Sequence, residues 1–315
     1  MICLSVAIIA VSLAIKIGDQ ITSSKNILGG MAVVPSVAGP DGPDSGFLAD
    51  KDENPTVAAK NTAEKSKPTG IPGVTASAYL VGNVKTGEVY LSKNAARVQP
   101  VASMSKLVTA FVATDIYSGT TTIPITAQAV LAPADGSNLV AGEHFTLDEI
   151  LKPLLLSSSN VAAEAISSTS STTDRAAFME LMRSYAWEVG MPHSFFADPS
   201  GVSPDNVASA EDMFGLAKYL MYYRPDVLTL TRMATASLAT TTDHGLHQIV
   251  STHPFVSDPR FIGGKTGRTA EAGETMLTIL DISDQPIAII ILGASYGARE
   301  SDTRILLEKV EGMVK

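Results

Sequence analysis

Residues 275–292 read TMLTILDISDQPIAIIIL, and this stretch decides the fold. Two runs rich in β-branched and aliphatic residues, Thr275–Leu280 and Ile287–Leu292, are separated by a short polar segment. Continuous apolar runs of this length are typical of strands that lie in the core of a sheet. The stretch therefore predicts two core strands, and the pattern that follows predicts a terminal helix over Ser301–Val314.

Further strands are predicted near the beginning of the folded part. Ala78–Val81 and Glu88–Leu91 flank Asn83–Gly87, the pattern of a β-hairpin with a glycine turn. Helical patterns fill the middle of the chain. They cover Leu107–Ile116, Leu147–Leu156 and Val161–Ile166 (interrupted around Pro153 and the serines that follow), Asp174–Val189 and Ala210–Tyr223. We therefore expect an α+β fold, in which N- and C-terminal strands form one antiparallel sheet flanked by helices, with an inserted mainly helical region.

The N-terminal third has a different composition. Residues 1–17 are predicted to be a signal peptide or an N-terminal membrane anchor, because Met1–Ile15 is an apolar run. Residues 18–73 are rich in Gly, Pro, Ser, Asp and Lys and predict a flexible linker. Residues 74–315 are then the catalytic domain. The single cysteine, Cys3, excludes an internal disulfide.

Charge and histidine spacing exclude two classes of function. The formal net charge of −9 argues against nucleic acid as a partner, since that binding needs clustered Lys and Arg. His244, His247 and His253 near Asp243 lack the His-Glu-x-x-His pattern of a zinc peptidase, so we interpret them as surface histidines. No metal and no cofactor is expected.

Three short motifs carry the chemistry. They are Ser103-Met104-Ser105-Lys106, Ser158-Ser159-Asn160 and Lys265-Thr266-Gly267. Lys85-Thr86-Gly87 repeats the third motif, but it lies in the predicted hairpin turn, whereas Lys265-Thr266-Gly267 enters a strand of the sheet core.

The first motif has the clearest physical basis. A serine at a helix start and a lysine three residues later lie on one face, one turn apart. A lysine acts as a general base only where burial or a neighbouring cation lowers the pKa of its amine. Apolar Leu107, Val108 and Phe111 offer burial for Lys106, and Lys265 offers the cation. Free N–H groups at the helix start can stabilise an oxyanion.

The ordered motifs resemble those of the D-alanyl-D-alanine carboxypeptidase family, the penicillin-binding serine DD-peptidases. The resemblance covers residues from about Val74 to the C-terminus and implies a β-lactamase/transpeptidase-like fold. It is carried by Pro100–Leu107, Leu154–Ala162 and Gly264–Thr269, followed by Ala272-Gly273. Two departures stand out. Ser159 replaces the usual middle glycine and is expected to crowd the site, and Asp198–Val202 differs from the family segment.

The resemblance implies a role for each motif residue. Ser103 is the nucleophile, Lys106 its base, Ser158 a proton relay, and Asn160 orients substrate and lysine. The implied substrate-binding residues are Lys265, Thr266, Gly267, Arg268, Thr269 and Arg299. Lys265 and Thr266 would hold the peptide carboxylate, and backbone N–H groups of Ser103 and Arg268 would form the oxyanion hole. Arg299 is equally compatible with a surface arginine that begins the last helix.

The implied substrate is a peptidoglycan stem peptide ending in D-Ala-D-Ala, cleaved in the cell envelope outside the cytoplasm, with β-lactams as covalent inhibitors. A DD-endopeptidase acting on cross-links would use the same residues. A class A β-lactamase needs a Glu-x-x-Leu-Asn segment, which is absent between Asn160 and Lys265. We interpret Glu164, Glu180, Glu188 and Glu211 as exposed helix charges. An inactive protein that binds stem peptides is the non-enzymatic alternative.

Overall fold

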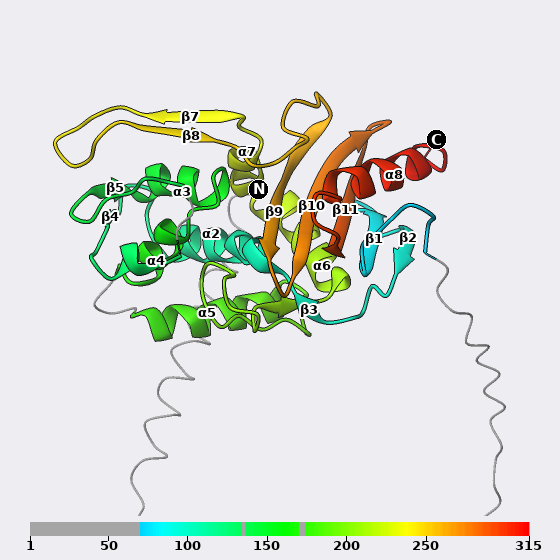
Figure 1. The fold of residues 1–315 in the computed structure, drawn as a ribbon, viewed down its shortest axis with the longest axis horizontal. Helices are drawn as coiled ribbons and strands as arrows, with labels where there is room; N and C mark the ends of the chain where they lie inside the picture. The colour runs from blue at the N-terminus through cyan, green and yellow to red at the C-terminus, as the bar shows by residue number, and fades with distance from the viewer. Residues whose placement is uncertain (1–69, 134–135, 170–173, 315) are drawn as a thin grey trace, which may run out of the picture. The chain divides into compact units, whose positions relative to one another are not determined.

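The computed structural model describes residues 70–133, 136–169 and 174–314. These residues form a five-stranded sheet in which every neighbouring pair is antiparallel, in the order β2-β1-β11-β10-β9 (Figure 1). The strands are, in chain order, β1 (Ala78–Asn83), β2 (Val89–Lys93), β9 (Phe261–Thr269), β10 (Gly273–Ile282) and β11 (Gln285–Ala294).

The first strand pairs with the last. The register of β1 on β11 runs from Ala78 opposite Leu292 to Asn83 opposite Ile287. The runs at 275–280 and 287–292 lie within β10 and β11, side by side in the middle of the sheet. The predicted antiparallel sheet built from both ends of the domain is therefore confirmed.

The predicted hairpin is also present, as β1 and β2. The amide oxygen of Asn83 accepts hydrogen bonds from the backbone N–H groups of Lys85 and Thr86, at 2.8 and 3.1 Å, and so closes the turn. Gly87 has a φ of +80°, a conformation that glycine adopts at no steric cost.

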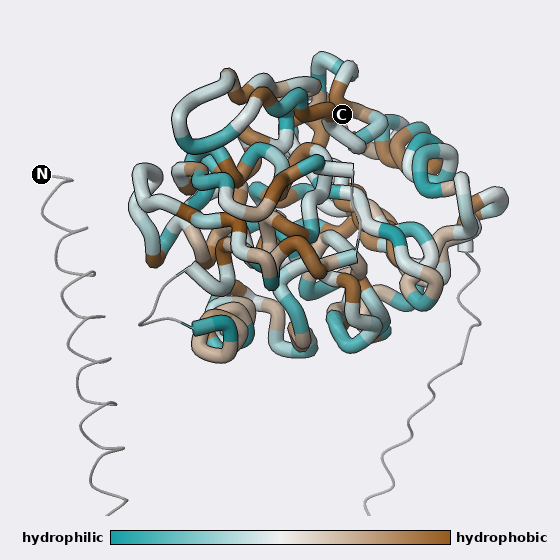
Figure 2. The backbone as a smooth tube through the Cα atoms, turned by 60° about the vertical axis from the view of Figure 1, so that its left-hand side comes forward, coloured by the Kyte–Doolittle hydropathy of each residue, from teal (hydrophilic) through white to brown (hydrophobic). Residues whose placement is uncertain are grey.

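Alternate residues of the central strands face two hydrophobic cores. Leu277 and Ile279 face the core that contains the inserted helices, whereas Met276 and Leu280 face a smaller core under the C-terminal helix. This division follows from the two-residue period of a strand. Hydrophobic segments accordingly gather in the interior of the molecule (Figure 2).

Seven helices are described. They are α2 (Ser105–Ile116), α3 (Leu147–Leu155), α4 (Asn160–Ser167), α5 (Arg175–Glu188), α6 (Ala210–Tyr223), α7 (Pro225–Thr231) and α8 (Arg299–Glu311). The predicted helices correspond to α2, α3, α4, α5, α6 and α8. The first nine residues of α2 are all buried, so this helix passes through the core. α8 covers the face of the sheet that is turned away from the inserted helices (Figure 1).

The predicted interruption between Leu147–Leu156 and Val161–Ile166 is present at the serines, but Pro153 itself does not interrupt the helix. α3 continues through Pro153 to Leu155, and the chain breaks only at the serines that follow. Pro153 lies in the last turn, where its carbonyl accepts hydrogen bonds from the Ser157 hydroxyl at 3.1 Å and the Ser159 N–H at 2.9 Å. A capping box of Thr146 and Glu149 stabilises the other end of α3.

Several short elements have no counterpart among the predictions. They are α7, two 3₁₀ helices, η1 (Ala102–Met104) and η2 (Ala129–Leu131), and three two-stranded pairs: β3 (Gln99–Pro100) with β6 (Val207–Ala208), β4 (Thr122–Pro124) with β5 (His144–Thr146), and β7 (Thr235–Leu238) with β8 (His247–Val250). Most are too short to leave a periodic pattern in the sequence.

The interpretation of three histidines as surface residues is wrong. His244, His247 and His253 are only 5–6% exposed. Phe145 stacks on the ring of His244, and Glu143 lies 2.9 Å from His247 Nε2. His253 Nε2 lies 3.0 Å from the carbonyl of Leu277, and burial lowers the pKa of His253 to about 3. No cluster of His, Cys, Asp and Glu suited to a metal ion occurs among the described residues.

The interpretation of four glutamates as exposed helix charges holds for three of them. Glu180, Glu188 and Glu211 are exposed, but the side chain of Glu164 is only 20% exposed. The reason is its contact with Arg175, at 2.7 Å, beside a pocket described below.

The predicted segment 1–17 and residues 18–69 of the predicted linker lie outside the described residues. Ile71 packs against the smaller core, and its N–H donates to the Tyr79 hydroxyl at 3.1 Å. Within the three described ranges, no helix has both the length and the apolar character needed to cross a membrane.

Candidate active site

The short helix η1 places Ser103 between the sheet and α2. Its first residue, Ala102, has a φ of +52°, which is unusual for a residue with a Cβ. Two glycines allow neighbouring backbone segments to approach η1 closely. A Cβ on Gly267 would lie 2.9 Å from the Ser103 nitrogen, and a Cβ on Gly201 would lie 2.0 Å from the Ala102 carbonyl oxygen. Ser103 is therefore fixed by close backbone contacts from β9 and from the loop that contains Gly201.

Lys106 is fully buried and its amine lies 3.0 Å from Ser103 Oγ. The same amine donates to Asn160 Oδ1 at 2.8 Å and to the Ser200 carbonyl at 2.5 Å. A neutral amine has two N–H donors and one lone pair. When Lys106 is deprotonated, its two donors serve Asn160 and Ser200 and its lone pair is left for the Ser103 hydroxyl, which is the geometry that a general base needs.

The second motif lies between α3 and α4. Ser158 has a φ of +64°, a strained conformation of the kind that clusters at functional sites. Asn160 begins α4, and its amide nitrogen donates to the Pro133 carbonyl at 3.0 Å, so its oxygen is turned toward Lys106.

Ser159 does not crowd the site, so that expectation is wrong. Its side chain is buried away from the cleft and accepts a hydrogen bond from the Ala162 N–H at 3.0 Å, which caps α4. A serine at this position is thus explained by helix capping.

Lys265 enters from β9. Its amine donates to Ser158 Oγ at 2.8 Å and to the Thr266 carbonyl at 3.0 Å. Burial lowers the pKa of Lys265 well below its ordinary value, and the charges of Lys106 and Arg299 lower it further. The two lysines and two serines of the three motifs therefore converge on one region, although they come from segments far apart in the sequence.

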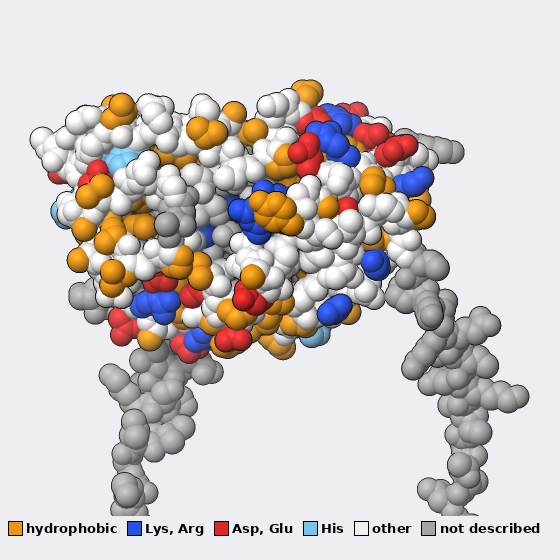
Figure 3. All heavy atoms as spheres, in the orientation of Figure 1, with side chains coloured by type: hydrophobic (Ala, Val, Ile, Leu, Met, Phe, Trp, Pro, Cys, Tyr) orange, Lys and Arg blue, Asp and Glu red, His pale blue; other side chains and the backbone are white. Residues whose placement is uncertain are grey.

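A cleft of about 270 Å³ opens above these groups. It is lined by Ser103, Ser157, Ser158, Asn160, Thr252, Thr266, Gly267, Arg268 and Arg299. In Figure 3, Lys and Arg side chains gather near the middle of the visible face, where β9 runs in Figure 1.

Arg299 does reach the cleft. It begins α8, and its guanidinium donates to the Gly267 carbonyl at 3.3 Å. Arg268 is exposed at the rim, with its guanidinium 5.1 Å from the centre of the Tyr296 ring. Thr269 is not part of the lining. Its hydroxyl accepts a hydrogen bond from the Ala272 N–H in the turn to β10.

The loop 198–203 supplies a contact that the motifs do not reveal. Asp198 Oδ1 accepts hydrogen bonds from the N–H groups of Ser200, Gly201 and Val202 and from the Ser200 hydroxyl, while Oδ2 accepts from the Ser203 N–H. Burial by itself would raise the pKa of Asp198, but these bonds outweigh burial and lower it. The carboxylate thereby fixes the loop that presents the Ser200 carbonyl to Lys106.

Thr252 is a second residue that the motifs do not reveal. Its hydroxyl lies 2.9 Å from that of Thr266 and donates to the Leu156 carbonyl at 3.3 Å. It lies on the connection from β8 to β9, which carries no recognisable pattern. The departure of Asp198–Val202 from the family segment drew attention to that loop but gave no role for it.

Residues 61–296 match the family model described as D-alanyl-D-alanine carboxypeptidase. The chain belongs to this family. It is therefore a hydrolase of the DD-peptidase type, and its family acts on peptidoglycan peptides that end in D-Ala-D-Ala and binds β-lactams.

Individual relatives agree with the family. A D-alanyl-D-alanine endopeptidase of Haemophilus influenzae is 30% identical over 243 residues, which cover 74% of this chain and 81% of the relative. A D-alanyl-D-alanine carboxypeptidase of Bacillus subtilis is 27% identical over 67% of this chain and 55% of its own length. The crystal structure of a D-alanyl-D-alanine carboxypeptidase from Mycobacterium tuberculosis has the same fold, with a TM-score of 0.71 and 22% identity over 79% of this chain and 96% of that one.

Proposed function

We propose that this protein is a serine-type D-Ala-D-Ala carboxypeptidase that removes the terminal D-Ala of peptidoglycan stem peptides through an acyl-enzyme on Ser103. The observation that carries the proposal is the position of the Lys106 amine, 3.0 Å from Ser103 Oγ and held by Asn160 and Ser200.

In the acylation step, Ser103 Oγ attacks the carbonyl carbon of the penultimate D-Ala, and its proton passes to Lys106. The oxyanion is stabilised by the backbone N–H groups of Ser103 and Arg268. The bond to the terminal D-Ala then breaks, and its nitrogen takes a proton through the Ser158 hydroxyl. Water hydrolyses the ester on Ser103 and restores the serine.

The terminal carboxylate of the substrate binds at the end of the cleft formed by β9 and the beginning of α8. Lys265 and Thr266 belong to adjacent positions of β9, and Arg299 lines the same cleft. A cation next to a hydroxyl donor is suited to a carboxylate, because charge-assisted hydrogen bonds are the stronger ones. Binding of the carboxylate also offsets the cost of a buried ammonium at Lys265.

Labelling with a fluorescent penicillin tests the catalytic assignment. The wild type is expected to become covalently labelled, and Ser103→Ala is expected to lose the label entirely. Lys106→Ala is expected to fold normally and to acylate at least about a hundredfold more slowly, the usual worth of a general base. A wild type that stays folded and unlabelled would favour the inactive binder, and normal acylation in Lys106→Ala would remove Lys106 from the base role.

A DD-endopeptidase acting on peptidoglycan cross-links is the second candidate, because a relative at 30% identity, matched over most of its length, carries that name. Both reactions would use the same acylation residues. Release of D-Ala from a stem pentapeptide, compared with cleavage of a cross-linked stem dimer, separates them. We expect faster release of D-Ala from the pentapeptide, and the reverse order would assign the endopeptidase.

The proposed location is the cell envelope outside the cytoplasm, where peptidoglycan lies. In this arrangement residues 1–17 direct export or anchor the chain, and the linker predicted over 18–73 leads into the catalytic domain. The domain already includes Ile71, which packs against its smaller core. The apolar run at Met1–Ile15 supports the first part of this arrangement.

A further inference from the structure

The beginning of the loop 198–203 is fastened to buried side chains by a row of backbone carbonyls. The carbonyls of residues 198–200 accept hydrogen bonds, in chain order, from the side chains of Asn206, Thr109 and Lys106, at 2.8, 2.6 and 2.5 Å. The third of these bonds holds the amine of the proposed general base. The first two belong to residues that have no part in the mechanism above.

Thr109 lies on α2, three residues after Lys106, so both side chains are on the same face of the helix and meet neighbouring carbonyls. The Thr109 hydroxyl has other possible acceptors, but these lie farther away, at 3.5 and 3.6 Å. The peptide unit between Pro199 and Ser200 is planar and is held at both ends, its carbonyl by Thr109 and its N–H by Asp198 Oδ1 at 2.7 Å. The Ser200 carbonyl, one peptide unit further, is thereby restricted in direction.

Asn206 joins the same loop to the segment that carries the nucleophile. Its amide nitrogen donates to the Asp198 carbonyl at 2.8 Å and to Ser105 Oγ at 3.1 Å, and its oxygen accepts from two consecutive backbone N–H groups, at 2.9 and 3.1 Å. Ser105 Oγ in turn donates at 2.9 Å to the carbonyl of Ala102, the residue with positive φ that precedes Ser103. One side chain therefore contacts both the loop and the start of α2.

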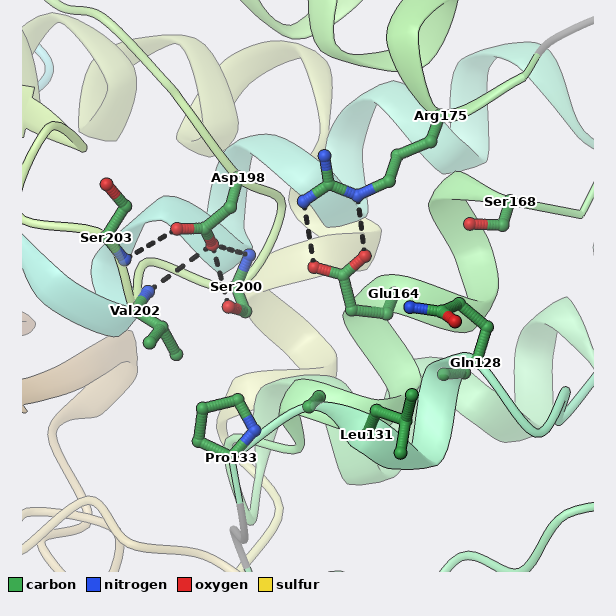
Figure 4. Close-up of a pocket in the computed structure, with 12 residues that line it drawn as sticks. Gln128, Leu131, Pro133, Glu164, Ser168, Arg175, Asp198, Ser200, Val202 and Ser203 are labelled. Atoms are coloured by element: carbon green, nitrogen blue, oxygen red, sulfur yellow. Dashed lines mark hydrogen bonds and ion pairs between the residues drawn. The ribbon is translucent and has the colours of Figure 1, made fainter.

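Another side of the loop faces open space. A pocket of about 570 Å³ lies there, and Glu164 and Arg175 line it together with residues of the loop (Figure 4). Figure 4 also shows the Asp198 carboxylate, which binds N–H groups of its own loop. Because no packed atoms support the loop on the pocket side, its position relative to Lys106 depends on the contacts with Thr109 and Asn206.

The side chains of this network cannot touch the substrate. Thr109 and Asn206 are 0% exposed, Ser105 is 1% exposed, and none of the three lines the cleft. Buried polar side chains are costly unless they are hydrogen-bonded, and here each has partners in a different segment of the chain. Any effect of these residues on the reaction must therefore act through the groups that they hold.

We propose that Thr109 and Asn206 are positioning residues for the Lys106 amine. They fix the two carbonyls that precede the carbonyl of Ser200, keep the latter directed at the amine, and so leave the lone pair of deprotonated Lys106 for the Ser103 hydroxyl. This inference rests on the proposed function, in which Lys106 is the base.

Thr109→Val tests the inference, because it removes the hydroxyl and keeps a side chain of similar shape. The full-length protein is reacted with fluorescent penicillin, and two quantities are measured: the acylation rate constant at saturation and the half-saturating concentration. We expect the rate constant to fall by about tenfold or more, since a displacement of about 1 Å can cost a reaction about a hundredfold. The half-saturating concentration should stay unchanged. Thr109→Ser, which retains the hydroxyl, should restore most of the rate.

Thr114→Val is the matched control. Thr114 lies on the same helix, and its hydroxyl donates to carbonyls of α2 itself, at 2.9 and 3.0 Å. This variant is expected to acylate at the wild-type rate. Asn206→Asp replaces the amide donor with an acceptor of the same shape and should slow acylation as Thr109→Val does. Because both residues act on one backbone segment, the double variant should lose less than the product of the two single losses.

The Lys106→Ala background distinguishes positioning from a general loss of structure. If Thr109 acts through the Lys106 amine, adding Thr109→Val to Lys106→Ala should not slow acylation any further. A general disturbance of the fold would slow acylation in both backgrounds. Thermal unfolding of each variant shows that it is folded, and if Thr109→Val is not, Asn206→Asp decides by the same comparisons.

The outcomes separate this inference from the proposed function. Wild-type acylation in Thr109→Val and Asn206→Asp, a change confined to the half-saturating concentration, or further slowing in the Lys106→Ala background overturns the positioning role while D-Ala release stands. A wild type that neither releases D-Ala nor reacts with penicillin overturns the proposed function, and the positioning role with it.

Discussion

At the scale of single residues, the candidate site depends on what surrounds two lysine side chains. Lys106 and Lys265 are both almost completely buried, at 0 and 1% exposure. Lys106 has two carbonyl acceptors and a serine hydroxyl around its amine, whereas Lys265 has a serine hydroxyl and one carbonyl. The surroundings of Lys106 suit proton transfer with Ser103. The surroundings of Lys265 are suited to an ammonium that binds an anionic group of the substrate.

The lowered pKa of Lys265 predicts a pH dependence of substrate binding. A lysine with a lowered pKa loses its proton at a lower pH than an exposed lysine, so its affinity for a carboxylate falls as the pH rises through that pKa. We expect KM for a peptide with a free C-terminal carboxylate to increase with pH, and to do so at a lower pH than the ordinary pKa of a lysine side chain would predict. The C-terminally amidated peptide should bind more weakly and show no such increase.

Lys265→Ala provides the control for this prediction. It should reduce the difference in affinity between the free and the amidated peptide, and what remains, held by Thr266 and Arg299, should no longer depend on pH in this way. If the wild type binds both peptides equally well, Lys265 does not hold the carboxylate.

At the scale of elements, the site depends on how closely β9 approaches η1. Gly267 makes this approach possible, because a Cβ there would lie 2.4 Å from Thr275 Oγ1 and 2.9 Å from both the Ser103 nitrogen and the Val101 carbonyl oxygen. Two of these three atoms belong to backbone, which cannot move aside as a side chain can.

Gly267→Ala is therefore expected to displace β9 from η1 and to slow penicillin acylation by more than about tenfold, at a cost in stability of about 1–3 kcal/mol typical of overpacking. Acylation kinetics and thermal unfolding measure the two effects. Gly245→Ala is the matched control, because a Cβ at Gly245 would meet only ordinary contact, at 3.6 Å from Glu143 Oε1. Unchanged acylation in Gly267→Ala would show that β9 need not lie this close.

Elements also show where sequence patterns are sufficient. The limits of α6 and the hairpin of β1 and β2 follow from local periodicity and turn residues. The continuation of α3 through Pro153 does not, because the hydrogen bonds that satisfy its end come from Ser157 and Ser159, whose positions depend on the packing of the next helix. The pair β7 and β8 lies outside the main sheet and has only four residues in each strand.

At the scale of the whole molecule, the sheet joins segments that are distant in sequence. β1 lies beside β11, and the two faces of the sheet carry separate hydrophobic cores. The cleft forms where the edge strand β9 meets the inserted helical region, and both contribute to the site. Lys265 comes from β9, Lys106 and Asn160 come from α2 and α4, and Ser158 comes from the connection between α3 and α4.

The sequence by itself determined four of the five strands of the main sheet (β1, β2, β10 and β11) and most of the helices. It also determined the meeting of Ser103 with Lys106, because one helical turn brings together residues three positions apart. Only the tertiary structure decided that Lys265 reaches Ser158, that the Ser200 carbonyl orients Lys106, that three histidines are buried, and that Glu164 and Arg175 line a pocket. The physical reason is that these contacts join residues from different elements. Their distances are set by how the cores pack, and no local period in the chain encodes them.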